Sequence, residues 1–261
     1  MAFSPYDWNE AIQHRSEYVQ NRLRDGSPVV ALSTQEAVMV LTIHRARRKV
    51  FEIYDRLLYS AIGNQADIET IRNTAIDFAH REGYSRSPDD VSIQRLVGFA
   101  VSPLLKRAFG EAFSSLFVIR AVFAEMGRAP EDDQYFSLNF DGEFSKSPRY
   151  AVVGGTEAAE EQMLKVLQER AKEPPALADA LDLALRVWAT GRLNARSREA
   201  VADDSDAQEK RVVALFSDEI KQATVEVGVL ERSSQREGKF RLLGPTELEP
   251  ALERYRSAAT T

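Results

Sequence analysis

The fold is decided by one stretch, K-V-F-E-I-Y-D-R-L-L-Y-S-A-I-G, which runs from Lys49 to Gly63. It predicts two short strands that meet at residues 54–56. Side chains of the first strand alternate between two faces, as in a half-buried strand. One face carries Val50, Glu52 and Tyr54, and the other carries Phe51, Ile53 and Asp55. The second strand, Leu57 to Ile62, is almost wholly apolar, which is typical of a strand covered on both faces.

Two more apolar strands are predicted on the N-terminal side, at Val29–Ser33 and Val38–Ile43. A helix should precede them, because Ser4-Pro5-Tyr6-Asp7 combines a capping serine, a proline at the first helical position and an acidic residue three positions after the cap. Gly26 should end this helix. Its apolar stripe comprises Trp8, Ala11, Ile12, Val19 and Leu23. Such a stripe packs either on the chain's own sheets or on a neighbouring subunit.

Two helices and three strands are predicted on the C-terminal side of the central stretch. The first helix carries the stripe Ile68, Ile71, Ala75 and Phe78. The second should be capped by Ser87-Pro88-Asp89-Asp90, and it should kink or break at Pro103, which lacks a backbone amide. Its stripe comprises Ile93, Leu96, Val97, Ala100 and Leu104. The three strands cover Leu116–Met126, Tyr135–Phe140 and Arg149–Val153, with a turn at Asn139–Gly142 between the last two.

A second pair of helices follows Gly154-Gly155-Thr156. The first is lined by Met163, Leu164 and Leu167 and is broken by Pro174-Pro175. The second carries Leu177, Leu181, Leu185 and Trp188. Residues 194–209 are polar and acidic and are predicted to form a mobile loop, with a short helix after residue 210. Strands at Thr224–Leu230 and Phe240–Leu243 should close the domain, and the tail after Pro250 should fray.

Runs of strands that alternate with pairs of helices favour stacked sheets with helices on the outside over repeated βαβ units. We therefore expect an α+β fold, a four-layer αββα sandwich of two antiparallel sheets flanked by helices, with a helix before the first strand. We expect the chain to divide into an N-terminal segment (1–25), the main domain (26–193), a polar insertion (194–222), closing strands of the same domain (223–250) and a flexible tail (251–261).

Composition excludes several classes of protein. The chain has 261 residues, a net charge of −6 and no cysteine. The charge and the absence of a basic stripe argue against a nucleic-acid partner. The lack of cysteine excludes disulfides and thiolate sites and fits a reducing cytoplasm. We find neither a signal segment nor an apolar run of membrane-spanning length, so we expect no membrane contact and a cytoplasmic location.

No metal or cofactor motif is present. His14, His44 and His80 lack the spacing of metal ligands, so we expect no metal site. Gly154-Gly155 lies between a strand and a helix, where a phosphate could bind, but the rest of a phosphate-binding motif is missing and three acidic residues follow. A tight turn is the better interpretation, and we expect no cofactor.

One arrangement indicates nucleophilic chemistry. Ser27 lies directly before the first strand, and Lys49 enters the third. If the chain were cleaved after Gly26, Ser27 would become an N-terminal nucleophile, its own amine could act as the base, and Lys49 could assist proton transfer.

Five segments together resemble the alpha subunits of bacterial proteasomes. These are R-S-E-Y in the leading helix, V-V-A-L in the first strand, K-V-F-E-I-Y-D-R with A-I-G after it, D-F-A-H-R-E-G-Y in the first long helix, and V-V-G-G-T-E before the third. The order of elements likewise resembles the sandwich of N-terminal-nucleophile hydrolases. The resemblance covers residues 4–188, whereas residues 194–222 depart from the pattern and look like an insertion.

The resemblance implies two subunit classes that share one fold. Beta subunits are the peptidases, and they need a threonine before the first strand, an aspartate at the end of the second and a lysine entering the third. Matched along V-V-A-L, these positions fall on Ser27, Ile43 and Lys49. Only the lysine is kept, and Ile43 cannot orient it as a carboxylate would. The resemblance therefore implies an alpha subunit with no catalytic residue.

Further roles follow from the resemblance alone. Seven copies would form a ring that caps a ring of beta subunits, packed through the leading helix at Trp8, Ile12, Val19 and Leu23. Met1, Ala2, Phe3 and Ser4 would form the gate over the pore through which unfolded proteins pass. Lys49 would pair with the C-terminal carboxylate of an ATPase ring or another activator.

Two alternatives remain open at this point. One is a peptidase or amidohydrolase that matures by cleavage before Ser27. The other is a proteasome-like cage that has no peptidase partner. The sequence identifies neither the activator nor the resting state of the gate.

Overall fold

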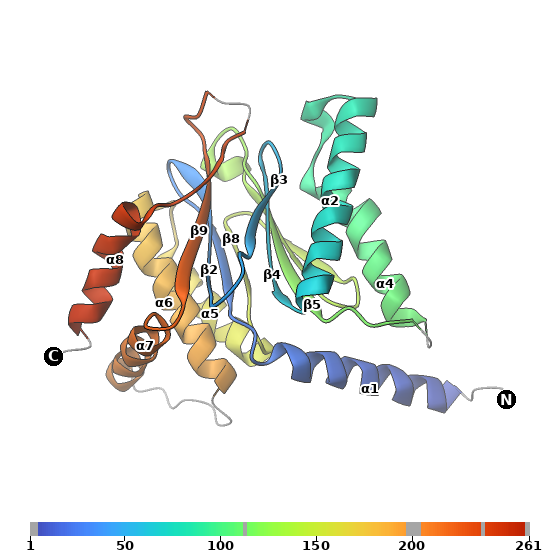
Figure 1. The fold of residues 1–261 in the computed structure, drawn as a ribbon, viewed down its shortest axis with the longest axis horizontal. Coiled ribbons are helices and arrows are strands. Elements are labelled where there is room, and N and C mark those ends of the chain that lie inside the picture. Colours follow the sequence, from blue (N-terminus) through green and yellow to red (C-terminus); the bar gives the residue numbers. More distant parts are fainter. Residues whose placement is uncertain (1–4, 112–113, 197–204, 236–237, 259–261) are drawn as a thin grey trace.

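The computed structural model describes residues 5–111, 114–196, 205–235 and 238–258. These residues form two antiparallel sheets that pack face to face, with helices covering both outer faces (Figure 1). The predicted αββα sandwich is confirmed, and helix α1 (Pro5–Leu23) precedes the first strand as expected. Ser4, the predicted cap of this helix, lies outside the described residues. None of the described helices has the length and apolarity that a membrane span requires.

Each sheet has five strands among the described residues. The first sheet is ordered β10 (Phe240–Leu242), β9 (Thr224–Glu231), β2 (Ala37–His44), β1 (Val29–Ser33) and β8 (Tyr150–Val153). The second is ordered β3 (Val50–Tyr54), β4 (Leu57–Gly63), β5 (Ile119–Glu125), β6 (Gln134–Leu138) and β7 (Phe144–Ser147). The chain passes from one sheet to the other between β2 and β3, so the loop 45–49 crosses one end of the sandwich.

Strand β4 is covered on both faces, as its apolar sequence predicted. Leu58 and Ile62 face the core between the sheets, where they meet side chains such as Val40 of β2. Leu57 and Tyr59 face the opposite way, toward the helices. Complete burial of each such side chain contributes about 1.5–3 kcal/mol to folding. Burial on two faces therefore places the central stretch in the middle of the molecule.

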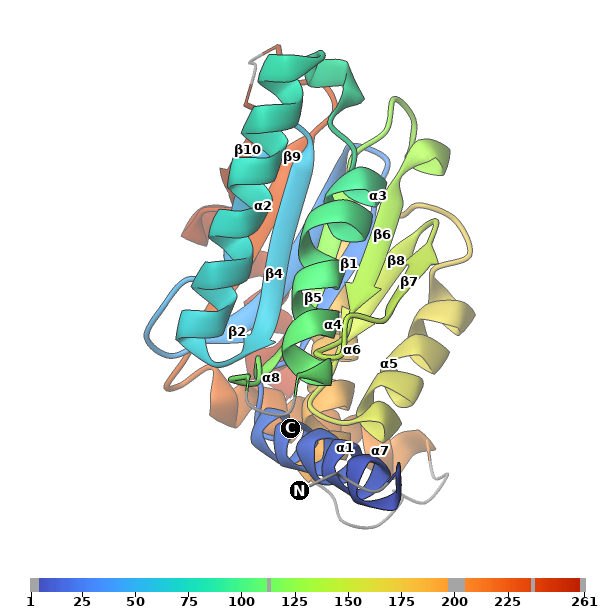
Figure 2. The same cartoon turned by 90° about the vertical axis from the view of Figure 1, so that its right-hand side faces the viewer.

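One helical layer covers the second sheet (Figure 2). It contains α2 (Gln65–Ser85), α3 (Ile93–Leu96), a π-helical turn at Val97–Val101 and α4 (Ser102–Gly110). The predicted cap at residues 87–90 is wrong as a helix start. Ser87 caps a separate 3-10 turn (Pro88–Asp90), and Ser92 caps the helix that begins at Ile93.

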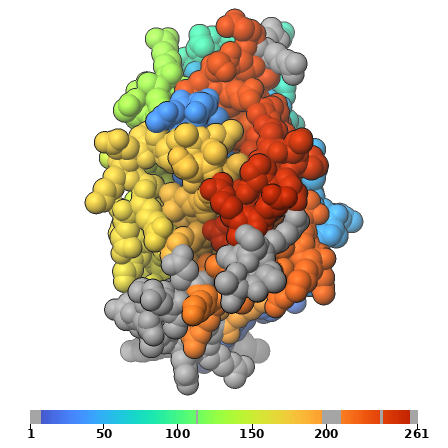
Figure 3. All heavy atoms as spheres, turned by 90° about the vertical axis from the view of Figure 1, so that its left-hand side faces the viewer, coloured from blue at the N-terminus to red at the C-terminus, as the bar shows by residue number. Residues whose placement is uncertain are grey.

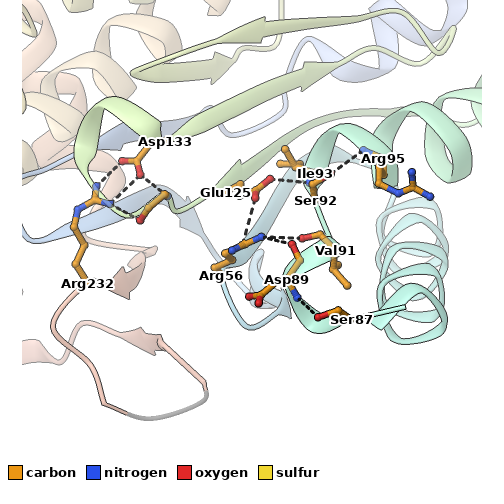
Figure 4. Close-up of polar contacts among 11 residues, drawn as sticks. Arg56, Ser87, Asp89, Val91, Ser92, Ile93, Arg95, Glu125, Asp133 and Arg232 are labelled. Atoms are coloured by element: carbon orange, nitrogen blue, oxygen red, sulfur yellow. Dashed lines mark hydrogen bonds and ion pairs between the residues drawn. The ribbon is translucent and has the colours of Figure 1, made fainter. Parts of the chain in front are cut away.

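A buried carboxylate explains this displaced helix start. Glu125 accepts a hydrogen bond from the amide of Ile93 at 2.8 Å and lies 3.3 Å from the guanidinium of Arg56 (Figure 4). Arg56 in turn donates to the carbonyls of Asp89 and Val91. These contacts tie the turn to the β3–β4 hairpin.

The predicted break at Pro103 is a local widening of the helix instead. The amide of Ser102 bonds to the carbonyl of Val97, five residues earlier, in the π-helical turn that precedes the proline. A π turn is one of the recognised ways in which a helix absorbs such an interruption. The helix then continues as α4.

The other helical layer covers the first sheet. It contains α5 (Glu157–Arg170), α6 (Leu177–Arg196), α7 (Ser205–Glu219) and α8 (Pro245–Ala258), of which α7 and α8 lie side by side (Figure 3). The short helix expected after residue 210 is present, but it begins earlier, at Ser205, so residues 205–209 are helical and not part of a loop. The tail expected to fray after Pro250 is helical as far as Ala258. Phe216 of α7 is fully buried, with its ring 6.1 Å from that of Trp188 and 4.8 Å from that of Tyr255. Residues 197–204 lie outside the described residues.

One strand, β7, was missed. The turn at residues 139–142 leads into β7 rather than directly into the strand at Tyr150, and Gly142 supplies the positive φ of 87° that the turn needs. Three of the four β7 residues are exposed, because it is the edge strand of its sheet. An exposed edge strand shows no apolar alternation, so the sequence carried no signal for it. A second short 3-10 turn, Pro130–Asp132, joins β5 to β6.

The far end of the sandwich is tied together by a buried ion pair. Arg232, which follows β9, meets the carboxylate of Asp133 through both of its terminal nitrogens, one of them at 2.9 Å (Figure 4). Asp133 is almost fully buried and also accepts a hydrogen bond from the amide of Gly127. The ion pair joins the β9–β10 hairpin to the loop between β5 and β6, at the opposite end from the loop 45–49.

Candidate functional site

The residues singled out in the sequence meet at one cavity. Because β1 and β2 are antiparallel and Val29 pairs with Thr42, the start of β1 lies beside the end of β2. The loop 45–48 then returns the chain to Lys49. Ser27, Ile43 and Lys49 consequently line one cavity of about 600 Å³, which extends to the ends of α1, α6 and α7.

Glu226 of β9 holds the crossing loop in place. Its carboxylate accepts hydrogen bonds from the backbone amides of Lys49, at 2.8 Å, and Val50, at 3.4 Å. It also lies 3.4 Å from the nitrogens of both His44 and Arg48. Glu226 is 5% exposed. A buried carboxylate with several donors fixes the backbone from which the Lys49 side chain projects.

The ammonium of Lys49 has an unfavourable setting. Burial lowers the pKa of Lys49, nearby Arg192 lowers it further, and Glu226 partly opposes both effects. Within the described parts of the chain, this ammonium forms no hydrogen bond and no ion pair shorter than 4.0 Å. A partly dehydrated cation without a close counter-ion is suited to bind an anion.

The cavity as a whole is cationic. Glu219, at the end of α7, is its main counter-charge, and the pKa of this carboxyl is lowered by Arg192 and Arg196 despite its burial. Glu219 contacts Arg192 and Arg45 at 3.4 Å each and also contacts Arg196. The lining carries two acidic residues against five basic ones, which are Arg22, Arg45, Arg47, Lys49 and Arg192. The geometry therefore favours an anionic ligand.

Ser27 is not arranged as a nucleophile with a base. Its hydroxyl oxygen accepts a hydrogen bond from the indole nitrogen of Trp188, at 3.1 Å. Ile43, at the position where a carboxylate would orient the lysine, is 2% exposed and belongs to the apolar core. The structure thus brings the three positions together without the acidic member.

Gly154-Gly155 forms a tight turn, in agreement with the sequence interpretation. A Cβ atom on Gly155 would lie 2.1 Å from the carbonyl oxygen of Arg24, so only glycine fits between the turn and the end of α1. The amide of Gly154 donates to the chain's own Glu160 at 2.8 Å. A carboxylate of the protein occupies the place where a phosphate would bind.

Comparison with known proteins places this arrangement in a family. The model of the family described as "Proteasome subunit" matches residues 24–193. The chain is 27% identical to the proteasome subunit alpha of Frankia casuarinae, with 94% of each chain covered. It is 28% identical to that of Kineococcus radiotolerans (90% and 92% covered) and 30% identical to that of Actinosynnema mirum (90% and 82% covered).

The chain belongs to the proteasome subunit family. Within this family it is an alpha-type subunit, as the resemblance in the sequence implied. The family match ends at residue 193, within α6. Helix α7 lies beyond this match, within residues 194–222, which the sequence indicated as an insertion.

The leading helix of this proteasome subunit is divided between two environments. Val19 and Leu23 are buried in the core between the sheets, at 0% and 1% exposure. Ile12 is only partly buried, and Trp8 is 40% exposed. The C-terminal half of the stripe thus packs within the chain, and the N-terminal half extends beyond it (Figure 1). Met1, Ala2, Phe3 and Ser4, the expected gate, lie outside the described residues.

Sequence reasoning missed two charged residues that line the cavity of the proteasome subunit, Arg192 and Glu219, and a third, Glu226, that holds the crossing loop beside it. All three lie more than 140 positions beyond Lys49 in the chain, so no local motif joins them to it. Arg192 had one indirect signal, because it follows Trp188 by four residues and shares its helix face. Glu226 showed none, since a single acidic residue in an apolar strand also occurs at sheet edges.

Proposed function

We propose that this proteasome alpha subunit is non-catalytic and that the cavity around Lys49 docks the C-terminal carboxylate of a regulatory ATPase ring or another activator. The observation that carries the proposal is the ammonium of Lys49, which is partly buried in a cationic cavity and has no close counter-ion among the described residues. A terminal carboxylate is compact and anionic, and it would supply the missing charge.

Ile43 supports the non-catalytic part of the proposal. A lysine that assists proton transfer needs an orienting carboxylate, and a buried isoleucine cannot provide one. The hydroxyl of Ser27 is engaged by Trp188, and α1 is anchored to the rest of the chain. Its Arg15 donates to the carbonyls of Ala108 and Ser114 at 2.8 and 3.3 Å. A segment with such contacts resembles a permanent element more than a propeptide.

The wider role follows from the family. Seven copies would form the outer ring, which would cap a ring of catalytic beta subunits and admit unfolded proteins through a gate formed by residues 1–4. The subunit would work in the cytoplasm. The N-terminal half of α1, with its exposed Trp8, would contact the neighbouring subunit in the ring.

The docking role is tested with Lys49→Ala. We expect the variant to assemble with the beta subunit as the wild type does, and to lose binding of the activator purified from the same organism. Surface plasmon resonance on the assembled particle measures this affinity. Arg47→Ala is the matched control, because Arg47 is an exposed cation on the same cavity. Unchanged activator affinity in Lys49→Ala would sink the proposal.

Intact mass of the denatured chain tests the non-catalytic assignment. We expect the full-length mass. A chain that begins at Ser27 would mean that the helix is removed and that the subunit is a self-processing hydrolase. Purification without any beta partner would favour a cage with no peptidase.

A further inference from the structure

The cavity that contains Lys49 offers a second positively charged donor, Arg192. This side chain is only 12% exposed and comes from the last turns of α6. Its Nη1 donates to the carbonyl oxygen of Asp25 at 2.8 Å, and its Nε lies 3.4 Å from Glu219. Its Nη2 donates no hydrogen bond to any described residue. Two fixed contacts therefore orient a guanidinium whose remaining edge is open.

Ser27 offers a third donor, for a reason of hydrogen-bond chemistry. An indole nitrogen can only donate, so the contact with Trp188 obliges the Ser27 oxygen to accept. The hydroxyl hydrogen must then point elsewhere, and no acceptor for it lies among the described residues. Trp188 is 1% exposed, so the core holds its indole in place.

The cations of Lys49 and Arg192 line the same cavity and repel one another, and the charge of Arg192 lowers the pKa of Lys49. The nearby carboxylates are already engaged. Glu219 is shared with Arg45 and Arg196, and Glu226 holds backbone amides. An anion placed between the two cations would remove their repulsion and satisfy the open donors together.

We propose that Arg192 and Ser27 bind the same carboxylate as Lys49, so that three donors hold the docked C-terminus. This inference rests on the docking function proposed above. A carboxylate has lone-pair sites for about four donors, so three are readily accommodated. It also gives the serine at the nucleophile position of the family fold a use that involves no bond cleavage. These three donors, which we call the clamp, are specific for a free C-terminus, because a carboxamide would place an N–H group against the two cations.

The test uses the assembled particle and two fluorescein-labelled peptides. Both carry the last eight residues of the regulatory ATPase encoded by the same genome, one with a free carboxylate and the other with a C-terminal amide. Fluorescence anisotropy gives their affinities for the wild type, Lys49→Ala, Arg192→Gln, Ser27→Ala and Ser27→Thr. We expect Arg192→Gln and Ser27→Ala each to weaken carboxylate binding about tenfold, the amide to be unaffected, and Ser27→Thr to bind as the wild type.

Arg47→Gln is the matched control for charge. It removes one exposed cation from the rim of the same cavity. We expect less than a twofold effect on carboxylate affinity at 0.15 M salt, because salt at this concentration largely screens an exposed charge from a bound anion. If Arg192→Gln does not assemble, Arg192→Lys replaces it, because it keeps the charge but loses the planar fork. An equal loss in Arg47→Gln and Arg192→Gln would overturn the role of Arg192 as a direct ligand.

The outcomes separate this inference from the function beneath it. If wild-type particles bind both peptides equally, the carboxylate-docking function fails and the clamp fails with it. If Lys49→Ala loses the preference for the carboxylate while Arg192→Gln and Ser27→Ala keep it, docking stands and the clamp is overturned. Loss of the preference in all three variants supports both.

Discussion

At the scale of single residues, the cavity shows a conflict between stability and binding. Lys49 would be more stable in water, yet the crossing loop and Glu226 hold it at a partly buried position. Functional sites often retain such unfavourable charges, because the binding partner later compensates them. Ile43 increases the conflict, since it stands where a carboxylate would have neutralised the ammonium.

We therefore predict that Lys49→Met stabilises the free subunit at pH 7. The pKa of Lys49 is lower in the folded chain than its ordinary value of 10.5. The cost of its charge is thus present in full below the lowered folded pKa and disappears as the pH rises toward the ordinary value. Calorimetry should show a melting temperature raised by about 2–4 °C at pH 7, which corresponds to about 1 kcal/mol, and a smaller gain at pH 10.

Lys221→Met is the control for this comparison. Lys221 is 68% exposed, and among the described residues its one ion pair is with Asp218, so its removal should leave the melting temperature unchanged at both pH values. A Lys49→Met variant that melts below the wild type at pH 7 would show that the attraction of Glu226 outweighs burial and the repulsion of Arg192.

At the scale of elements, the sequence identified those whose side chains repeat with a clear period. The stripe of α2, the alternation of β3 and the apolar run of β4 each predicted which side chains are buried. It did not identify β7, an exposed edge strand, or α8, and it predicted only the part of α7 that follows residue 210. Burial of Phe216 depends on Trp188 and Tyr255, from two other helices, and no local pattern contains that information.

We predict that α7 is a structural element and not a dispensable insertion. Phe216→Ala should lower the free energy of unfolding by about 3–5 kcal/mol, because it removes a fully buried ring from between two aromatic neighbours. Urea unfolding followed by circular dichroism measures the change. Asp218→Ala is the control, because Asp218 lies two residues further along α7 and is 78% exposed. It should change the free energy of unfolding by less than about 0.5 kcal/mol. Equal stability of the two variants would mean that α7 is not packed as described.

At the scale of the whole molecule, α1 is an element that packs against the rest of its chain along only part of its length. Its C-terminal half completes the core between the sheets, whereas Trp8 and Tyr18 remain 40% and 53% exposed. Large aromatic side chains on one protruding helix are typical of protein–protein contacts. The ring proposed for the subunit would cover Trp8 and the N-terminal half of the helix.

We predict that Trp8→Ala weakens the ring without unfolding the subunit. The side chain contributes little to the chain's own core, so circular dichroism and the melting temperature of the unassembled subunit should be unchanged. Truncation of an aromatic residue that is central to an interface costs about 2 kcal/mol or more, and a ring of seven repeats this loss at every contact. Native mass spectrometry should therefore show the wild type as a heptamer or a double ring and Trp8→Ala mainly as smaller species.

Tyr84→Ala is the matched control, because Tyr84 is 95% exposed on α2, away from the leading helix. If Tyr84→Ala dissociates and Trp8→Ala stays assembled, the ring contact lies on the helical layer over the second sheet, and α1 serves the subunit alone.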